Sequence, residues 1–170
     1  QRLNLYSLSV EFLGAMAAGD IKGAQSLVDY GIEPKSSLLG LPWVTARLKM
    51  IEADPLQHAW MYRAIVRKRD DQMVGFISFH HKAPDPDLVE YVKLGAELGY
   101  TIEPQYRRNG YAKESAIAMM EWACRDFGVR DFVLTISPQN SPSLKMAASM
   151  GFKIVGEKDD PIDGLELVMR

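Results

Sequence analysis

A short polar turn between an apolar strand and a long helix carries the residues best suited to binding an anion. The turn contains Arg107, Arg108 and Asn109, and Gly110 and Ala112 follow at the start of the helix. The first backbone N–H groups of a helix have no acceptor within it, and the helix dipole adds partial positive charge there. A phosphate therefore binds well at such an end. Because Gly110 has no Cβ atom, a diphosphate can approach the backbone closely.

The elements around this turn form a strand–helix–strand unit. An apolar run from Leu94 to Ile102 predicts the first strand, residues 110–127 have the spacing of an amphipathic helix, and β-branched residues dominate 131–137. A crossover of this kind joins parallel strands. Over the whole chain the patterns predict a strand, three helices, three strands, a helix, a strand, a helix and two final strands. The other expected elements are strands 2–6, 62–67, 73–79, 152–156 and 165–169, and helices 10–18, 20–30, 42–53 and 142–150.

Two motifs in these positions carry a resemblance to a known family. The spacing Arg107-x-x-Gly110-x-Ala112 is similar to the acetyl-CoA signature Q/R-x-x-G-x-G/A of the GNAT N-acetyltransferase superfamily. Asn140-x-x-Ser143, with a Gly-Phe pair beginning eleven residues after the Asn, resembles its second motif. The stretches 97–102 and 2–5 look most like the Rim-type branch, which acetylates ribosomal-protein N-termini. The resemblance implies a single α/β domain over residues 1–170, with a mixed sheet of about six to seven strands, helices on both faces and a splayed strand pair.

The resemblance also implies how acetyl-CoA would bind as co-substrate. The diphosphate would lie on the N–H groups of the turn, the pantetheine arm between the splayed strands 98–102 and 133–137, and a backbone N–H near Tyr100 or Ile102 would receive the acetyl carbonyl. Asn140 and Ser143 would hydrogen-bond the arm. The implied binding residues are Tyr100, Thr101, Ile102, Arg107, Arg108, Asn109, Gly110, Tyr111, Ala112, Asn140 and Ser143.

Direct transfer to an amine requires a base, and Glu97 at the start of the central strand is the first candidate. A half-exposed strand residue or an ion-pair partner is an equally good interpretation of Glu97. His80 and His81 are the second choice, with a solvated loop pair as the simpler interpretation. Many members of the family have a tyrosine as the acid seven residues after the Asn, where this chain has Ala147. Ser143 or a bound water is then the expected proton donor to the thiolate.

Composition limits the remaining possibilities. A net charge of −2 argues against a general nucleic-acid binder, and no stretch has the length and hydropathy of a membrane span. The single cysteine, Cys124, is expected in the core, which excludes an internal disulfide and suits a reducing cytoplasm. No metal is expected, because no cysteine or third histidine lies near His80 and His81. The expected partners are acetyl-CoA and an amine acceptor, a peptide N-terminus or a small molecule, and the chain is expected to be a monomer or a homodimer.

Three functions stay open at this point. The leading hypothesis is an acetyl-CoA-dependent N-acetyltransferase without an acyl-enzyme. The second is an inactive acyl-CoA-binding module that regulates a partner, which the alanine at position 147 favours. The third is a nucleotide-binding α/β protein, which is disfavoured because no G-K-[ST] follows the glycine of the turn.

Overall fold

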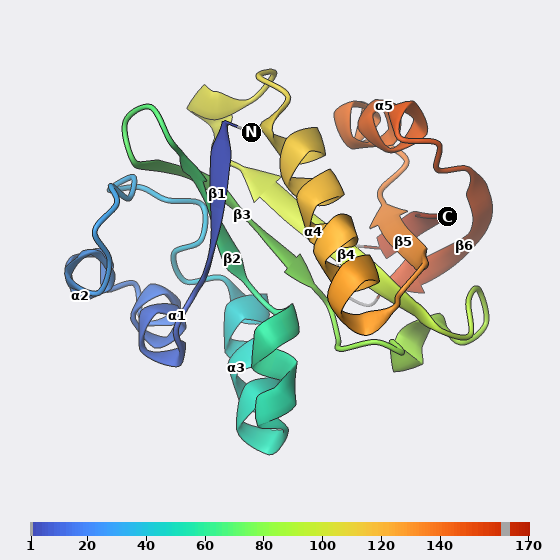
Figure 1. Ribbon diagram of the computed structural model, residues 1–170, viewed down its shortest axis with the longest axis horizontal. Helices are drawn as coiled ribbons and strands as arrows, with labels where there is room; N and C mark the ends of the chain where they lie inside the picture. The colour runs from blue at the N-terminus through green and yellow to red at the C-terminus, as the bar shows by residue number, and fades with distance from the viewer. Residues whose placement is uncertain (1, 161–163) are drawn as a thin grey trace. The chain divides into compact units, whose positions relative to one another are not determined.

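A computed structural model describes residues 2–160 and 164–170 (Figure 1). The strands are β1 (Leu3–Ser7), β2 (Arg63–Arg67), β3 (Gln72–Phe79), β4 (Gly95–Ile102), β5 (Asp131–Ile136), β6 (Ile154–Asp160) and β7 (Gly164–Met169). The helices are α1 (Val10–Ala17), α2 (Ile21–Ser26), α3 (Pro42–Ala53), α4 (Tyr111–Phe127) and α5 (Ser141–Ser149), with 3₁₀ turns η1 (Pro55–Trp60), η2 (Pro86–Leu88) and η3 (Pro104–Tyr106). The seven-stranded sheet has the order β1-β2-β3-β4-β5-β7-β6, which confirms the predicted mixed α/β class.

The chain forms two compact units that interrupt each other in the sequence. The first comprises the residues up to Ser78 together with Tyr100–Ser115, and the second comprises Phe79–Gly99 together with Ala116–Arg170. Strands β3 and β4 and helix α4 therefore each contribute residues to both units. That residues 1–170 make a single domain stays a prediction.

The helices of the first unit begin where local capping rules place them. The Ser9 side chain accepts a hydrogen bond from the backbone N–H of Phe12 at the start of α1, and Asp20 accepts one from Gly23 at the start of α2. Helix α3 begins with Pro42, whose fixed φ suits the first turn and whose missing N–H costs nothing there. The Ser9 and Asp20 side chains thus each supply an acceptor for an N–H that the helix leaves without one.

The core of the first unit lies between these helices and the strands β2 and β3. Figure 1 shows α1, α2 and α3 gathered beside β1 and β2. Burying large apolar side chains is the main stabilising contribution in such a core. Its fully buried members include Leu8, Phe12, Leu13, Met16, Leu38, Val44, Met61 and Ala64.

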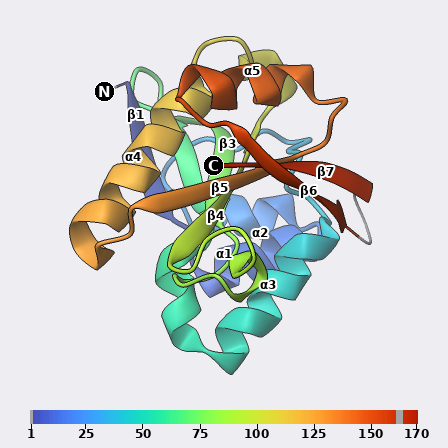
Figure 2. The same cartoon turned by 90° about the vertical axis from the view of Figure 1, so that its right-hand side faces the viewer.

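The second unit is built on β5. This strand pairs in parallel with β4 and antiparallel with β7, and β7 pairs with β6 (Figure 2). The parallel register joins residues 95–97 to residues 131–133, although β4 continues to Ile102 and β5 to Ile136. A register this short is what a splayed strand pair requires. The rings of Phe79, Trp122 and Phe132 stack in this unit.

Several sequence expectations differ from the structure. Helix α2 ends at Ser26 and not at residue 30, and β6 covers Ile154–Asp160 and not residues 152–156. The 3₁₀ turn η1 follows the Asp54-Pro55 break, where no element was predicted, and Asp54 caps it. Cys124 is exposed, so its expected burial is wrong. Ala116, Met119 and Ala123 form the buried stripe of α4, and one residue further along the helix the side chain has turned by about 100° away from it. None of the described helices combines the length and the apolar character that crossing a bilayer requires.

Candidate functional site

The turn before α4 has a backbone shape that only a few residue types tolerate. Arg108 and Gly110 both adopt positive φ, at 60° and 79°. The side-chain amide of Asn109 donates to the backbone oxygens of Tyr106 and Arg107, at 3.0 and 2.9 Å, and thereby holds the turn closed. Glycine adopts such a φ at little cost, whereas a residue with a Cβ pays for it. The turn is thus shaped by its own residues.

The arginines near this turn have different roles. Arg107 donates from Nε to the carbonyl oxygen of Ile102, at 2.9 Å, so part of its guanidinium serves to hold the end of β4. Arg2 donates to the backbone oxygen of Asn109 at 3.0 Å, and its guanidinium lies over the ring of Tyr111, 5.0 Å from the ring centroid. Arg108 is exposed. The sequence motif identified Arg107 and Arg108 but gave no signal for Arg2.

The backbone N–H groups at the start of α4 donate no hydrogen bond to the described part of the chain. Within residues 2–160 and 164–170, none of the N–H groups from Arg108 to Ala112 donates to a protein acceptor. Glu114 lies in the same first turn, but its carboxylate is paired with Arg2 at 2.8 Å. Desolvation raises the pKa of Glu114, and the hydrogen bonds and charge of Arg2 outweigh it and lower the pKa. Because this carboxylate is compensated, the helix end keeps its preference for an anion.

Along the end of β4, the backbone N–H and C=O groups of successive residues point alternately toward β3 and away from it. The N–H of His80 donates to the oxygen of Glu97, and the N–H of Glu103 donates to the oxygen of Val74 on β3, both at 2.9 Å. Backbone groups of odd-numbered residues therefore face β3. Since direction reverses at each residue of a strand, the even-numbered ones point away from β3. These are Leu98, Tyr100 and Ile102.

In the second unit Glu97 lies in a polar cluster. Its side chain is 2% exposed and accepts a short hydrogen bond from the hydroxyl of Thr135. The Nδ1 atom of His80 lies 3.2 Å from Glu97 Oε1, and the Lys158 ammonium lies 3.8 Å from Oε2. A buried carboxylate needs such partners, because burial without them is costly. The structure therefore joins the two candidate bases, and the interpretation of His80 as a solvated loop residue is wrong.

These partners decide the protonation state of Glu97. Burial by itself raises its pKa, but the hydrogen bond and charge of His80, the Thr135 hydroxyl and Lys158 together lower the pKa to about 2. A carboxylate with so low a pKa is a weak proton acceptor. Since a carboxylate only accepts hydrogen bonds, it fixes a proton on Nδ1 of His80, so that in the neutral imidazole the lone pair lies on Nε2.

Gly99 makes room for the His80 ring. A Cβ atom built on Gly99 would lie 2.7 Å from Nε2 of His80, closer than atoms approach without displacement. The ring therefore lies directly over the backbone of β4, and its side chain is 33% exposed. Gly99 was not singled out in the sequence, because a glycine in a strand signals only that another group approaches the backbone closely.

The second motif lies at the start of α5. Asn140 is exposed and caps the helix, accepting at 3.3 Å from the backbone N–H of Ser143. Ala147, where many relatives have a tyrosine, is fully buried in the second unit. Its methyl group is core packing. Among the predicted site residues, the structure thus places Asn140 in contact with Ser143, and Glu97 in contact with His80.

Two members of the Glu97 cluster were missed in the sequence. Thr135 lies two residues beyond Val133, the partner of Glu97 in the parallel register, so both β5 side chains lie on the face that carries Glu97. A hydroxyl within the apolar run 132–136 was the available signal. Lys158 gave none, because its position depends on the register of β6 with β7.

Comparison with known proteins places this geometry in a family. A family model for the acetyltransferase (GNAT) domain matches residues 9–153. An uncharacterised N-acetyltransferase, YnaD, from Bacillus subtilis is 24% identical over 92 residues, 54% of this chain and 49% of that protein. The chain thus aligns with about half the length of this curated relative.

Solved structures share the fold over nearly the whole chain. Ribosomal-protein-S5-alanine acetyltransferase from Vibrio fischeri has a TM-score of 0.64 at 15% identity, covering 99% of this chain and 92% of that one. RimL, a ribosomal L7/L12 α-N-protein acetyltransferase solved with coenzyme A, has a TM-score of 0.63 at 19% identity, with 99% and 92% covered. With the matched family model, these findings show that the chain belongs to the GNAT acetyltransferase family.

Proposed function

We propose that this protein is an N-acetyltransferase that moves an acetyl group from acetyl-CoA directly to a primary amine. The observation that carries the proposal is the row of N–H groups from Arg108 to Ala112 that donate to no acceptor in the described residues, in a turn shaped by positive φ at Arg108 and Gly110. Such a turn binds a diphosphate through backbone donors and the helix dipole together. Exposed Arg108 adds a positive charge, while Arg107 and Asn109 hold the turn in shape.

The thioester would bind along the end of β4. Tyr100 and Ile102 direct their backbone groups away from β3, and on that side they would meet the amides of a pantetheine arm. The carbonyl oxygen of Ile102 already accepts from Arg107, so Ile102 would contribute its N–H. The N–H of Tyr100 or Ile102 would donate to the acetyl oxygen and stabilise the negative charge that develops on it. The Asn140 side chain and Ser143 would bind the arm at the start of α5, whereas the backbone of Thr101 faces β3 and takes no part.

Proton transfer is assigned to the His80–Glu97 pair. A carboxylate with a pKa of about 2 accepts protons poorly, so we assign the role of base to Nε2 of His80 and the role of orienting the ring to Glu97. The amine nitrogen attacks the thioester carbon, the C–S bond breaks, and the amine proton passes to His80 directly or through water. The thiolate of CoA is released and takes a proton through Ser143 or water, and the proton that His80 accepted returns to the solvent, so that Ser143 and His80 both regain their starting states.

The acceptor class follows from the demand for a neutral amine. An α-amine has a pKa near 8, so about a tenth of it is neutral at pH 7, whereas a lysine amine near 10.4 is almost wholly charged. A peptide N-terminus or a small amine of low pKa therefore asks least of the base. Two structural neighbours are named for acetylating ribosomal proteins, which supports testing N-terminal peptides first.

Incubation with acetyl-CoA and a panel of N-terminal peptides, lysine peptides and small amines tests the proposal. We expect mass spectrometry to show one added acetyl group on an α-amine acceptor, with stoichiometric release of CoA. Calorimetry should show CoA binding to the same preparation. Absence of both CoA binding and transfer to any acceptor would refute the proposal.

An acyl-CoA-binding regulatory module is the second candidate, and buried Ala147 favours it because no tyrosine acid can act from that position. It predicts CoA binding that is unchanged in Glu97→Gln and His80→Gln, with no acetylated product from any acceptor. Turnover in the wild-type protein that falls in His80→Gln decides for the enzyme.

A further inference from the structure

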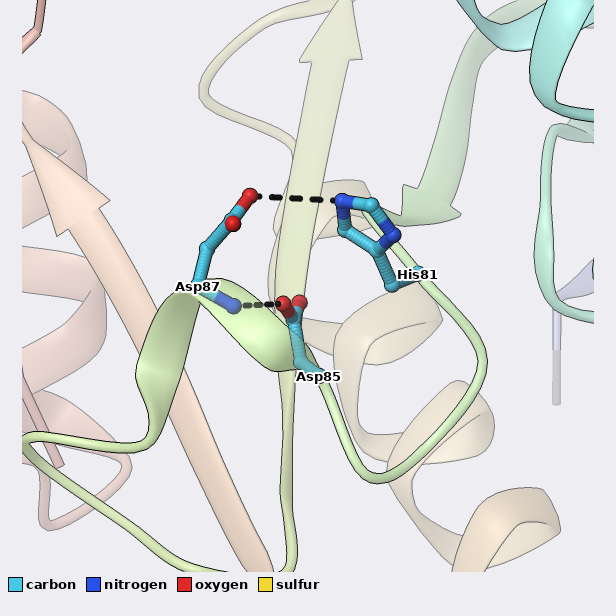
Figure 3. A group of neighbouring side chains, drawn as sticks. All are labelled: His81, Asp85 and Asp87. Carbon is cyan, nitrogen blue, oxygen red and sulfur yellow. Dashed lines mark hydrogen bonds and ion pairs between the residues drawn. The ribbon is translucent and has the colours of Figure 1, made fainter.

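We propose that His81, Asp85 and Asp87 form a binding site for a divalent transition-metal cation of the Zn²⁺ class. The three residues lie within seven positions on the segment between β3 and β4, in the second unit (Figure 3). One donor atom from each lies within 4.8 Å of the other two. This site is separate from the proposed acetyl transfer and does not depend on it.

The spacing of two donors already suits one ion. Nε2 of His81 lies 3.3 Å from Oδ2 of Asp87. Two ligands at about 2.1 Å from a tetrahedral zinc ion lie about 3.4 Å apart. A separation of 4.8 Å would have to shorten by about 1.4 Å to reach that value, which is about 0.7 Å of movement for each of the two donor atoms.

Asp85 supplies the observation that points to a ligand. The residue is 1% exposed, and one carboxylate oxygen, Oδ1, accepts the backbone N–H of Asp87 at 3.0 Å. The other oxygen, Oδ2, is buried and has no hydrogen-bond partner in the described chain. Figure 3 shows the Asp85 carboxylate directed toward the side on which His81 and Asp87 meet. A buried carboxylate left in this state is costly, and a cation bound at Oδ2 removes that cost.

The backbone holds Asp85 in place for this role. Its N–H donates to the carbonyl oxygen of Gly95 at 3.0 Å, which ties the segment to the first residue of β4. Leu88, at the end of η2, is fully buried beside Val133 and Val168 in the core of the second unit. A ligand fixed in this way loses little conformational entropy when an ion binds.

The donor set selects the class of ion. One imidazole and two carboxylates suit Zn²⁺ or Mn²⁺ better than Ca²⁺ or Mg²⁺, which take mainly oxygen ligands. The sequence expectation of no metal counted cysteines and histidines near His80 and His81. That expectation did not consider carboxylates as ligands. No pattern in the chain indicates that Asp85 is buried, so the sequence alone did not single out this residue.

Metal binding is tested on tag-free, chelator-treated full-length protein titrated with ZnCl₂, with MgCl₂ as the contrast. We expect one Zn²⁺ per chain with a Kd below about 10 µM by calorimetry, and a rise in Tm with Zn²⁺ but not with Mg²⁺. Asp85→Asn, His81→Gln and Asp87→Asn should each weaken Zn²⁺ binding at least tenfold, about the loss that a disturbed metal shell causes. Asp159→Asn, a carboxylate-to-amide change at an exposed position of β6, should bind Zn²⁺ as the wild type does.

Asp85→Asn keeps an oxygen for the Asp87 N–H and removes the buried charge, so without metal we expect its Tm to match or exceed that of the wild type. Co²⁺ absorption in the visible range gives an independent record of coordination, and should be present in the wild type and absent in this variant. The proposal is overturned if the wild type binds no Zn²⁺ at about 0.1 mM, a concentration well above the expected Kd. It is equally overturned if binding survives in Asp85→Asn and His81→Gln, or is lost in His80→Gln instead.

Discussion

At the scale of single residues, the contacts of Glu97 favour the second of its two interpretations from the sequence, that of an ion-pair partner. Glu97 was the candidate base, yet the contacts with His80, Thr135 and Lys158 stabilise its charged form. The same contacts hold the imidazole with its Nε2 atom over Gly99. A residue can thus be located from its position in a strand while the role of base is proposed for its partner.

This division of roles predicts different losses in two variants. His80→Gln should lower kcat by about 10² to 10³, the usual contribution of a general base, with CoA affinity unchanged. Glu97→Gln keeps an acceptor for Nδ1 but removes the charge, so its loss in kcat should be smaller. Steady-state kinetics across pH 6 to 9, with about ten substrate concentrations, and calorimetry with CoA separate the two effects. An equal loss in both variants together with weaker CoA binding would contradict the assignment.

At the scale of elements, the glycine before α4 combines a positive φ with an open surface. Gly110 has φ of 79°, and the nearest atom to a built Cβ is a flexible guanidinium nitrogen of Arg2 at 3.5 Å. A side chain there is therefore strained by the backbone more than by neighbours, and it would occupy the place of a diphosphate. Gly128 ends the same helix with φ of 70° and nothing within 4 Å.

These two glycines form a matched pair for an experiment. Gly110→Val should weaken CoA binding at least tenfold, about the 1.4 kcal/mol that one lost close approach represents. Gly128→Val carries comparable backbone strain at the other end of the helix, and its CoA affinity should stay within about twofold of the wild type. Calorimetry on both, with Tm values to show that both fold, gives the comparison. Equal affinities would refute the placement of the diphosphate.

Local signals were sufficient for most elements and for half of the candidate site. Ser9, Asp20 and Pro42 mark helix starts through contacts within one turn, and the structure has all three. The turn before α4 was equally local. The pairing of Glu97 with His80 depends on strand β3 lying beside β4, and the burial of Asp85 depends on packing around Leu88. Such contacts join distant residues, so spacing along the chain does not encode them.

At the scale of the whole molecule, buried and half-buried carboxylates with opposite pKa shifts determine how stability depends on pH. At Glu97 the partners of the carboxylate outweigh the effect of burial, and the pKa falls to about 2. Burial dominates at Asp85 and Glu166, whose pKa values are raised. A lowered pKa contributes stability that is complete above the ordinary pKa of 4.5 and is lost as pH falls toward 2, whereas a raised pKa acts in the opposite direction.

Glu97→Gln should therefore flatten the acid side of the stability curve. The wild type should lose free energy of unfolding as pH falls from about 5 toward 3, and this variant should lose less over the same range, because glutamine does not titrate. Urea unfolding at several pH values measures both slopes. Asp85→Asn should change the curve with the opposite sign, which makes it the internal control. A wild-type curve and a Glu97→Gln curve of the same slope would contradict the role given to this carboxylate.

The exposed side chain of Cys124 has a practical consequence for every assay that counts sulfhydryl groups. The chain contains one cysteine, and it lies at the surface of α4. A colorimetric reagent for CoA release will also react with this residue, and the background is one equivalent per polypeptide. That fixed background measures the protein concentration in the same cuvette, and Cys124→Ser removes it when a zero baseline is wanted.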